Sequence, residues 1–312
     1  MILPQTTSLC DASELAAIIL QKPLSLADLT RQFFPGQNQG EAEEQTDPQK
    51  GAPTSQLREA LRLAISRQAA CGDVYPFNVS ERCIEAHKIS AFNPYVFMLL
   101  GRGLNFGGPE AAQALLQEFR IQFEDVVCWA MRQAGFVAEV LSEPRGPRGL
   151  HVQLVPALRE LAVRFGEAAV LRVEKLEPHD NDLDVDVLAV PVKGNAMRGH
   201  WPVFLIQCAT GALARLQAKV SEGATTFTTV WENGFSCANS VRGGATPDDL
   251  LALAENHWNR LCEAGWILDR TRIAYLASCG GSFPLPNDVS SFWEKLWAAR
   301  KDIDWLTGWQ AA

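Results

Sequence analysis

Apolar positions recur with helical spacing along most of the first hundred residues. They lie three and four residues apart in Asp11–Phe34 and in Gln56–Ala70, which predicts short helices there. Ser25 precedes one of these apolar runs and is the residue type expected at a helix N-cap. A buried helix is expected at Asn93–Leu104, with Pro94 in its first turn.

A polar stretch interrupts these helices. Residues 35–55 are rich in Gly, Gln, Glu, Pro and Thr and contain almost no apolar side chain, so we expect a flexible exposed loop at about residues 35–55. The character of the chain changes near Gly108, where the first of several alternating helix and strand patterns begins. We therefore predict a helical N-terminal region over residues 1–105 and a second domain over residues 106–312.

Helix and strand patterns alternate through this second part, which predicts a mixed α/β fold. A helix is expected from Pro109 to Gly135 with one break, and a long helix is expected at Thr246–Gly265 with Thr246 as its cap. The other predicted strands are Phe136–Leu141, Asp186–Val190, Val203–Cys208 and Thr225–Trp231, and the other predicted helices are Ala157–Gly166, Ala212–Ser221 and Ser291–Ala299.

The composition narrows the class of protein. The 312 residues are 47% hydrophobic and 21% charged, as in ordinary globular proteins, and the net charge is −8. Free-standing nonspecific nucleic-acid binders usually carry a basic excess, so any nucleic-acid contact requires a local basic patch or a partner. The chain begins without a secretory signal and contains no apolar run long enough for a membrane span, so we expect a cytoplasmic protein with no membrane contact.

The cysteines do not form a recognisable framework. The eight cysteines include no CxxC pair and no regular spacing, and a disulfide scaffold is not expected in a chain of this size. We interpret Cys128, Cys208 and Cys262 as small buried residues in a reducing compartment.

Four aspartates alternate along one short segment, Asp180, Asp182, Asp184 and Asp186. A calcium loop of this spacing would need Gly at its sixth position, where this chain has Val185. Four carboxylates on one strand face would repel each other, so we place the first three in a solvated turn and Asp186 at the start of a strand. The alternative for the whole segment is an ordinary solvated acidic loop.

A second polar side chain ends a fully apolar strand. Gln207 follows Pro202–Ile206 and precedes a turn that contains Gly211. Binding sites of α/β sheets are commonly built at strand ends, although a buried amide satisfied within the fold is the alternative. Asp186 and Gln207 together would give an oxygen-rich site of the kind that Mg²⁺ prefers.

These motifs resemble the PD-(D/E)XK, or restriction-endonuclease-like, nuclease superfamily over roughly Gly108–Trp231. Its core begins with a helix that supplies an acidic residue, and Glu124 in QFEDVVCWAMRQAGF matches that position. An Asp then begins the second core strand, as Asp186 does. The next strand carries Glu or Gln, any residue and then Lys, and here Gln207 matches the first of these positions.

The chain departs from the motif at the lysine, because Ala209 stands in its place. In some members this lysine lies on the following helix, where Lys219 is the candidate and Arg215 lies one turn before it on the same face. The QCATG string and the upstream Tyr75-Pro76-Phe77 segment are similar to a branch of prokaryotic defence-associated nuclease-like proteins.

The resemblance implies a restriction-endonuclease-like mixed sheet flanked by helices, and a metal-dependent DNA endonuclease in anti-phage defence. Glu124, Asp186 and Gln207 would bind Mg²⁺ or Mn²⁺, and Lys219 or Arg215 would stabilise negative charge on the phosphate. The alternative is a catalytically inactive nuclease-fold subunit that scaffolds a defence complex, which the acidic net charge and Ala209 favour. RNA is a third possible target, and a partner protein or homo-oligomer is expected.

Arginines of the loop after Phe136–Leu141 and of the helix that follows it form the notable basic cluster of the sequence. The loop EPRGPRG could lie against a phosphate backbone, or its arginines could be ordinary solvated side chains. The cluster consists of Arg145, Arg148, Arg159 and Arg164.

Overall fold

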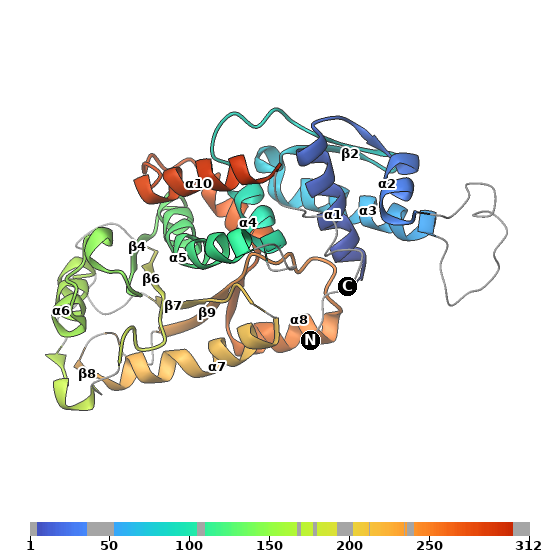
Figure 1. Ribbon diagram of the computed structural model, residues 1–312. Helices are drawn as coiled ribbons and strands as arrows, with labels where there is room; N and C mark the ends of the chain where they lie inside the picture. The colour runs from blue at the N-terminus through green and yellow to red at the C-terminus, as the bar shows by residue number, and fades with distance from the viewer. Residues whose placement is uncertain are drawn as a thin grey trace.

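The protein is a mixed α/β structure, and the predicted fold class is confirmed at this level. Its five-stranded sheet is accompanied by a three-stranded and a two-stranded sheet, and helices cover both faces of the main sheet (Figure 1). Within the described part of the chain, no helix is long and apolar enough to cross a membrane. The computed structural model describes residues 5–35, 53–104, 110–166, 170–176, 180–191, 202–211, 213–233, 235 and 240–301.

Helices and a small sheet make up the described residues before position 105. The sheet has the order β1-β3-β2 with antiparallel pairs, and the sequence analysis did not predict it. The bounds of these elements are α1 (Gln5–Leu20), β1 (Leu24–Ser25), α2 (Leu26–Phe33), α3 (Pro53–Cys71), β2 (Phe77–Ser80), β3 (Cys83–Ala86) and α4 (Pro94–Gly103).

Side-chain caps account for where two of these helices begin, and both predicted starts are confirmed. Ser25 accepts a 3.2 Å hydrogen bond from the Asp28 amide, and Asp28 accepts a 3.0 Å bond from the Ser25 amide. Pro94 occupies the first turn of α4, directly after its N-cap Asn93. Helix α3 begins at Pro53, inside the stretch predicted as a flexible loop; residues 36–52 of that stretch lie outside the described residues.

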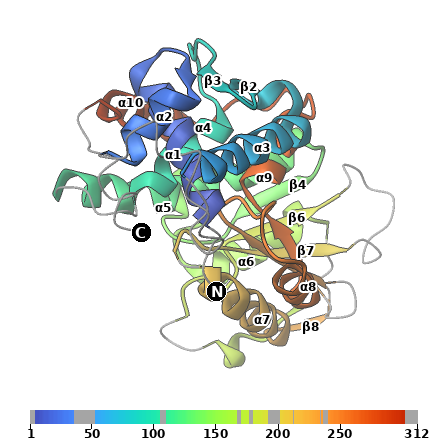
Figure 2. The ribbon, with the colours of Figure 1, turned by 90° about the vertical axis from the view of Figure 1, so that its right-hand side faces the viewer.

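The main sheet combines an antiparallel meander with a parallel half. β4, β6 and β7 pair antiparallel, whereas β7, β9 and β10 pair parallel, in the order β10-β9-β7-β6-β4. Helix α7 lies in the connection from β7 to β9, and Figure 2 shows it with α8 below the strands. The bounds are β4 (Val137–Val140), β6 (Val187–Val190), β7 (Val203–Cys208), β9 (Ser240–Ala245), β10 (Trp266–Leu268), α5 (Glu110–Gln133) and α7 (Leu213–Thr229).

Each face of the main sheet packs against its own hydrophobic core. Val187 and Ile206 face a large cluster that includes α5 and also residues of α1, α4 and α10. Leu188 and Leu205 face the other way, toward α6 (Leu154–Arg164) and the end of α7. This alternation is that of strands buried on both faces. The N-terminal helices thus share a core with the main sheet, and the domain boundary near residue 105 stays a prediction.

The predicted strand at Thr225–Trp231 is wrong, because α7 continues through Thr229. Leu216, Val220 and Phe227 are buried at helical spacing against the sheet, so tertiary packing overrides the strand propensity of the threonines. The predicted break in the Pro109–Gly135 helix is also wrong, since α5 is continuous. The remaining elements are β5 (Val170–Leu171), β8 (Trp231–Asn233), α8 (Glu255–Ala264), α9 (Arg270–Ala277) and α10 (Asn287–Ala299).

The predicted long helix at Thr246–Gly265 is largely wrong, because only α8, from Glu255, is helical. Thr246 does not cap it. Two acids of this segment form buried ion pairs instead, Asp248 with Arg102 and Asp249 with Arg67. The interpretation of Cys262 as buried is also wrong, whereas Cys128 and Cys208 are buried as predicted; the described cysteines are free thiols.

A buried ion network centred on Arg67 joins the N-terminal helices to the main sheet. The Arg67 side chain is inaccessible to solvent; its Nη1 lies 2.7 Å from Asp11 Oδ1 and 2.9 Å from Glu14 Oε1. Its Nε lies 2.7 Å from Asp249 Oδ2, in the segment that follows β9. Arg270, at the start of α9, also pairs with Asp11.

Tyrosine hydroxyls complete this network from the other side. Tyr75 donates a 2.6 Å hydrogen bond to Glu14 Oε1, and Tyr95 donates a 2.9 Å bond to Glu14 Oε2. Buried charges are tolerated only when they are paired and hydrogen-bonded, so loss of one partner leaves the others uncompensated. The network therefore fixes α1 and α3 against the end of β9.

Replacing Arg67 with Met should lower the free energy of unfolding by about 3–5 kcal/mol, because Glu14 and Asp249 lose their buried arginine partner and Asp11 keeps only Arg270. Urea denaturation measures this. The matched control is Arg62→Met on the same helix, since Arg62 pairs with Glu81 at 3.3 Å and both side chains are 63% exposed. The control should cost less than about 1 kcal/mol. Equal losses of unfolding free energy in the two variants would show that the buried network contributes no more than an exposed ion pair.

Candidate functional site

The start of β6 and the end of β7 bring Asp186 next to Gln207 and Cys208. The Asp186 amide donates a 3.0 Å hydrogen bond to the carbonyl of Ile206, the residue that pairs with Val187 where β6 begins. The Cys208 amide in turn donates a 2.6 Å bond to Asp186 Oδ2. Because a backbone donor holds this carboxylate, its position is set by strand pairing itself. The two strand ends thus meet as the sequence spacing suggested.

Gln207 is buried and leaves one polar atom unused. Its Nε2 donates to the Asp184 carbonyl, which anchors the amide to the acidic turn before β6. Its Oε1 is buried and has no hydrogen-bond partner in the described part of the protein. A buried acceptor without a partner costs free energy, and such atoms often mark the position of a ligand or ion. The alternative of a fully satisfied amide therefore does not describe this side chain.

Glu124 lies in the middle of α5 and is held by two donors. The Ser142 hydroxyl donates to Glu124 Oε2, and Arg148 Nη1 lies 3.1 Å from the same oxygen. Arg148 also pairs with Asp125 at 2.9 Å and donates a 3.1 Å hydrogen bond to the Ser142 carbonyl. No local sequence pattern indicated Arg148 and Ser142 as partners of Glu124.

The charge of Asp186 influences the ionisation of Glu124. Burial and, next, the negative charge of Asp186 raise the pKa of Glu124 to about 8 against the opposing effects of Ser142 and Arg148. Burial also raises the pKa of Asp186 to about 6, although Lys219 and the Cys208 amide oppose this. Two buried carboxyl groups thus lie within electrostatic range. The cations and hydrogen-bond donors around them do not fully offset their negative charge.

Lys219 lies on α7 and contacts the end of β7, where Ala209 provides no positive charge. Its Nζ donates a 3.1 Å hydrogen bond to the Cys208 carbonyl, and its charge lowers the pKa of Asp186. Lys219 remains an exposed residue, so its ammonium group is accessible to a ligand. Between the two cations considered from the sequence, Lys219 is the one with these contacts; Arg215 is exposed one turn earlier.

The Cys208 thiol lies among these groups but is not a nucleophile. Burial raises its pKa well above the usual value, and the charges of Asp186 and Glu124 raise it further. A thiol in these surroundings stays protonated and unreactive.

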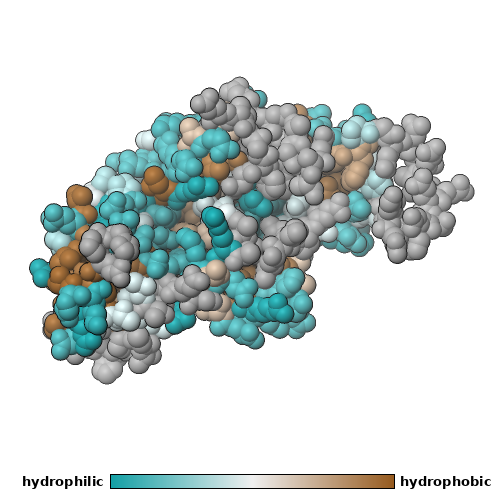
Figure 3. Space-filling view, turned by 60° about the horizontal axis from the view of Figure 1, so that its bottom comes forward, coloured by the Kyte–Doolittle hydropathy of each residue, from teal (hydrophilic) through white to brown (hydrophobic). Residues whose placement is uncertain are grey.

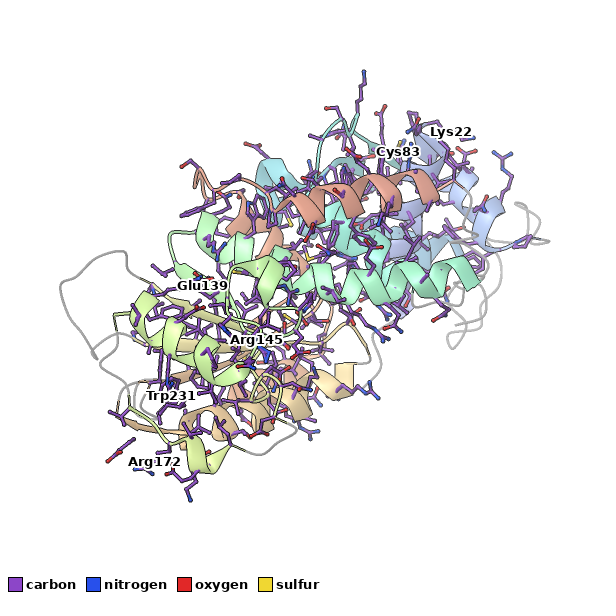
Figure 4. All side chains as sticks on the ribbon, turned by 60° about the vertical axis from the view of Figure 1, so that its left-hand side comes forward. Lys22, Cys83, Glu139, Arg145, Arg172 and Trp231 are labelled. Carbon is purple, nitrogen blue, oxygen red and sulfur yellow. The ribbon has the colours of Figure 1, made fainter. Side chains whose placement is uncertain are left out.

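The arginines of the loop after β4 are internal, so the suggestion that this loop lies against a phosphate backbone is wrong for its two arginines. Arg145 is 2% exposed, donates to the Asn181 carbonyl and lies 3.2 Å from Glu143. Figure 4 shows Arg145 among the other side chains in the middle of the molecule, whereas Arg172 lies at its outline. One property of the sequence is consistent with this result. A chain with an excess of acidic residues offers a loop arginine many partners within the protein.

A hard divalent cation fits the chemistry of this site. The described residues contain no group of three or more His, Cys, Asp and Glu side chains arranged to hold a metal ion, so a metal here would depend on two carboxylates. A cation would offset the burial that raises the pKa values of Glu124 and Asp186, and Gln207 Oε1 is an oxygen without a hydrogen-bond partner among the described residues. The donor set, which is oxygen only, is the one that Mg²⁺ and Mn²⁺ prefer.

Comparison with known proteins adds no relative to this picture. No family model, curated protein or solved structure matches the chain. The function is therefore argued from the geometry of the site and from its sequence motifs.

The raised pKa of Glu124 predicts a pH-dependent stability difference. Because the folded protein holds this proton more tightly than the unfolded chain, the contribution of Glu124 to stability is complete below about pH 4.5 and is lost as the pH rises through about 8. Glu124→Gln removes the ionisation. In EDTA, the variant should gain about 1–3 kcal/mol relative to the wild type between pH 5 and pH 9.

Urea denaturation of both proteins at several pH values checks this expectation. Glu118→Gln is the matched control, because Glu118 lies on the same helix but pairs at the surface with Lys295 at 2.8 Å. A Glu124→Gln difference that stays constant with pH would contradict the buried, mutually repelling pair.

Proposed function

We propose that the protein is a metal-dependent endonuclease that hydrolyses phosphodiester bonds of DNA, with a restriction-endonuclease-like core. The observation that carries this proposal is the meeting of Glu124, Asp186 and Lys219 around the end of β7, where both carboxyl groups have raised pKa values. Perturbed acids beside an accessible cation are typical of catalytic sites.

The order of the elements supports the same proposal. Helix α5 carries Glu124, β6 follows Asp186 as the second strand of the main sheet, and β7 carries Gln207 as the third. The following helix, α7, carries Lys219. This is the order in which the PD-(D/E)XK superfamily places its acidic helix, its Asp strand, its Glu or Gln strand and, in some members, its displaced lysine.

Glu124, Asp186 and the Gln207 carbonyl would hold Mg²⁺ or Mn²⁺, which when bound activates a water molecule and neutralises charge on the phosphate. The protein's own residues prepare this chemistry. The Cys208 amide orients Asp186, and Arg148 with Ser142 orients Glu124.

Gln207 and Lys219 have separate roles. Gln207 would offer its amide oxygen to the metal, and Lys219 would act on the substrate. Anchoring of Gln207 Nε2 on the Asp184 carbonyl fixes where the amide oxygen lies. Lys219, exposed and attached to the Cys208 carbonyl, supplies an ammonium group that stabilises negative charge developing on a phosphate oxygen. An amide in place of a third carboxylate removes one negative charge, so we expect weaker metal affinity than in a site with three acids.

A cytoplasmic role in prokaryotic anti-phage defence is the biological setting that we propose. It depends on the resemblance of the QCATG and Tyr75-Pro76-Phe77 strings to defence-associated nuclease-like proteins. The net charge of −8 favours action together with a partner protein or as a homo-oligomer that contributes to DNA binding.

The second candidate is a catalytically inactive subunit that scaffolds a defence complex. Ala209 favours it, and so does apolar surface at one end of the molecule. Figure 3 shows hydrophobic surface gathered at the left end, where Figure 1 places α6. Exposed apolar side chains of this kind often mark a protein interface. The exposed valines in α6 and in the residues that flank it in the sequence are Val152, Val163, Val170 and Val173.

A cleavage assay separates the two candidates. Supercoiled plasmid, linear duplex, single-stranded DNA and RNA are each incubated with Mg²⁺ or Mn²⁺ and the wild type, Asp186→Asn or Lys219→Ala. We expect DNA cleavage by the wild type and a loss of at least about 100-fold in each variant, because a metal ligand or the phosphate-stabilising charge is removed.

The controls are Asp73→Asn and Lys295→Ala, which change an exposed aspartate and an exposed lysine away from the site. They should cleave like the wild type. Cleavage that survives in Asp186→Asn would place the activity elsewhere, and absence of cleavage by the wild type under every condition would favour the scaffold. Cleavage of RNA alone would change the substrate but keep the site.

A further inference from the structure

A cleft of about 670 Å³ follows the outer edge of the main sheet, between β10 and α8. It is distinct from the candidate site, because β10 is the outermost strand and β9 separates it from β7. Its size is that of a small-molecule pocket. Residues that line it include Arg242, Trp258, Cys262, Trp266, Ile267 and Arg272.

The cleft is a local basic surface on an acidic protein. Among the described residues, the charged side chains that line it are two arginines, whereas the whole chain has a net charge of −8. Arg242 is exposed, and the side chain of Arg272 is 39% exposed. Arg272 Nη1 lies 2.7 Å from Asp269 Oδ2; the Asp269 side chain is inaccessible to solvent, so it orients the guanidinium from behind. A nucleic-acid contact in an acidic protein requires a local basic surface of this kind.

Two indole rings border the same cleft. The Arg272 guanidinium lies over the Trp258 ring, 4.5 Å from its centroid, and the Trp266 ring packs against Phe204 with the centroids 4.8 Å apart. These contacts hold both rings in place, and both tryptophans remain partly exposed. Proteins that bind single strands combine arginines for the phosphates with aromatic surfaces on which bases stack.

The cleft lies on the side of the main sheet that α7 covers. A Cβ atom on Gly244 would lie 2.4 Å from Val220 of α7, so this position of β9 faces α7. Because strand positions alternate, Arg242, two residues earlier, faces α7 as well. Lys219, the residue before Val220, extends from α7 to the end of β7. The register of β7 and β9 places Arg242 three residues before the partner of Cys208, which is about 10 Å along the strands.

We infer that this cleft binds a segment of single-stranded DNA, with phosphates at Arg242 and Arg272 and a base against the tryptophan rings. The inference rests on the proposed nuclease function, because it assigns the cleft to a strand of that substrate. It gives the DNA backbone a surface in place of the loop after β4, whose arginines are internal. Binding here is independent of sequence, since phosphate contacts and base stacking do not distinguish the bases.

The position of the cleft gives this contact a consequence for the reaction. A strand held by Arg242 and Arg272 leaves the cleft on the side where Lys219 lies, about 10 Å of strand length from the end of β7. Holding the strand at this second place restricts the motion of the phosphate that Lys219 contacts, which makes its correct placement more frequent. The cleft would thus be a positioning surface for the substrate.

The thiol of Cys262 reports directly on occupancy of the cleft. Cys262 lines the cleft, whereas Cys279 is an exposed free thiol outside it and serves as the control within the same molecule. The wild-type protein in EDTA is alkylated with iodoacetamide, with and without a short oligothymidylate, and each cysteine is followed by peptide mass spectrometry. With the strand at about ten times its Kd, alkylation of Cys262 should slow by about tenfold, because only about a tenth of the protein is unoccupied. The rate at Cys279 should not change.

Charge variants locate the binding, which fluorescence anisotropy of the labelled strand measures. Arg242→Gln and Arg272→Gln should each weaken binding by about tenfold and reduce the slope of log K against log salt by about 0.7, the loss of one phosphate contact. Cys262→Glu changes an exposed position and places a negative charge in the cleft, so it should also weaken binding. Asn256→Glu adds the same charge to α8 at an exposed position outside the cleft and should bind like the wild type.

Several results would overturn the inference. They are an unchanged alkylation rate at Cys262, equal slowing at Cys262 and Cys279, equal affinities in all the variants, and tighter binding of duplex than of the single strand. Protection of Cys262 by thymidine monophosphate as effective as that by the strand would assign the cleft to a free nucleotide and also overturn it. Because these measurements need neither metal nor cleavage, the two proposals fail separately. Protection in a protein that cleaves no DNA would support the cleft alone, and cleavage without protection would overturn the cleft alone.

Discussion

Two buried carboxyl groups, Glu124 and Asp186, lie within electrostatic range of each other, and the chemistry of the site depends on this pair. Burial without full compensation raises the pKa of both, to about 8 and about 6. Each carboxyl is held by its own partners, Arg148 with Ser142 for the first and the Cys208 amide for the second. A cation bound beside such a pair would offset its negative charge and stabilise the fold, which is why we propose metal chemistry for this site.

The rest of the fold keeps the elements of this site in place. Helix α5 contributes Glu124 to the site, so the position of this helix determines where that carboxyl group lies. The buried network around Arg67 fixes α1 and α3 on the segment after β9. The large hydrophobic core to which these helices contribute also contains residues of α5 and β7. A rigid scaffold of this kind preserves the geometry of charged side chains that would otherwise repel each other.

The sequence predicted the parts of the fold whose signals are local. Ser25 and Pro94 mark helix starts by their own chemistry, and the apolar run before Gln207 marks a central strand. Strand β9 was missed because it is rich in glycine: a Cβ atom on Gly244 would lie 2.4 Å from Val220, so α7 packs where a side chain would stand. The meeting of Asp186 with Gln207 was predictable from strand spacing, whereas the hold of Arg148 on Glu124 depends on a long-range contact that no local pattern encodes.

Direct titration with Mn²⁺, followed by electron paramagnetic resonance, tests the central claim without depending on substrate or partner. The account predicts a single Mn²⁺ site that weakens by at least about 10-fold in Asp186→Asn and in Glu124→Gln, since each variant removes a charged ligand. Asp73→Asn, remote from the site and exposed, should bind like the wild type. Binding that is equal in all four proteins, or no binding at millimolar Mn²⁺, would contradict the assignment of Glu124 and Asp186 to a metal centre.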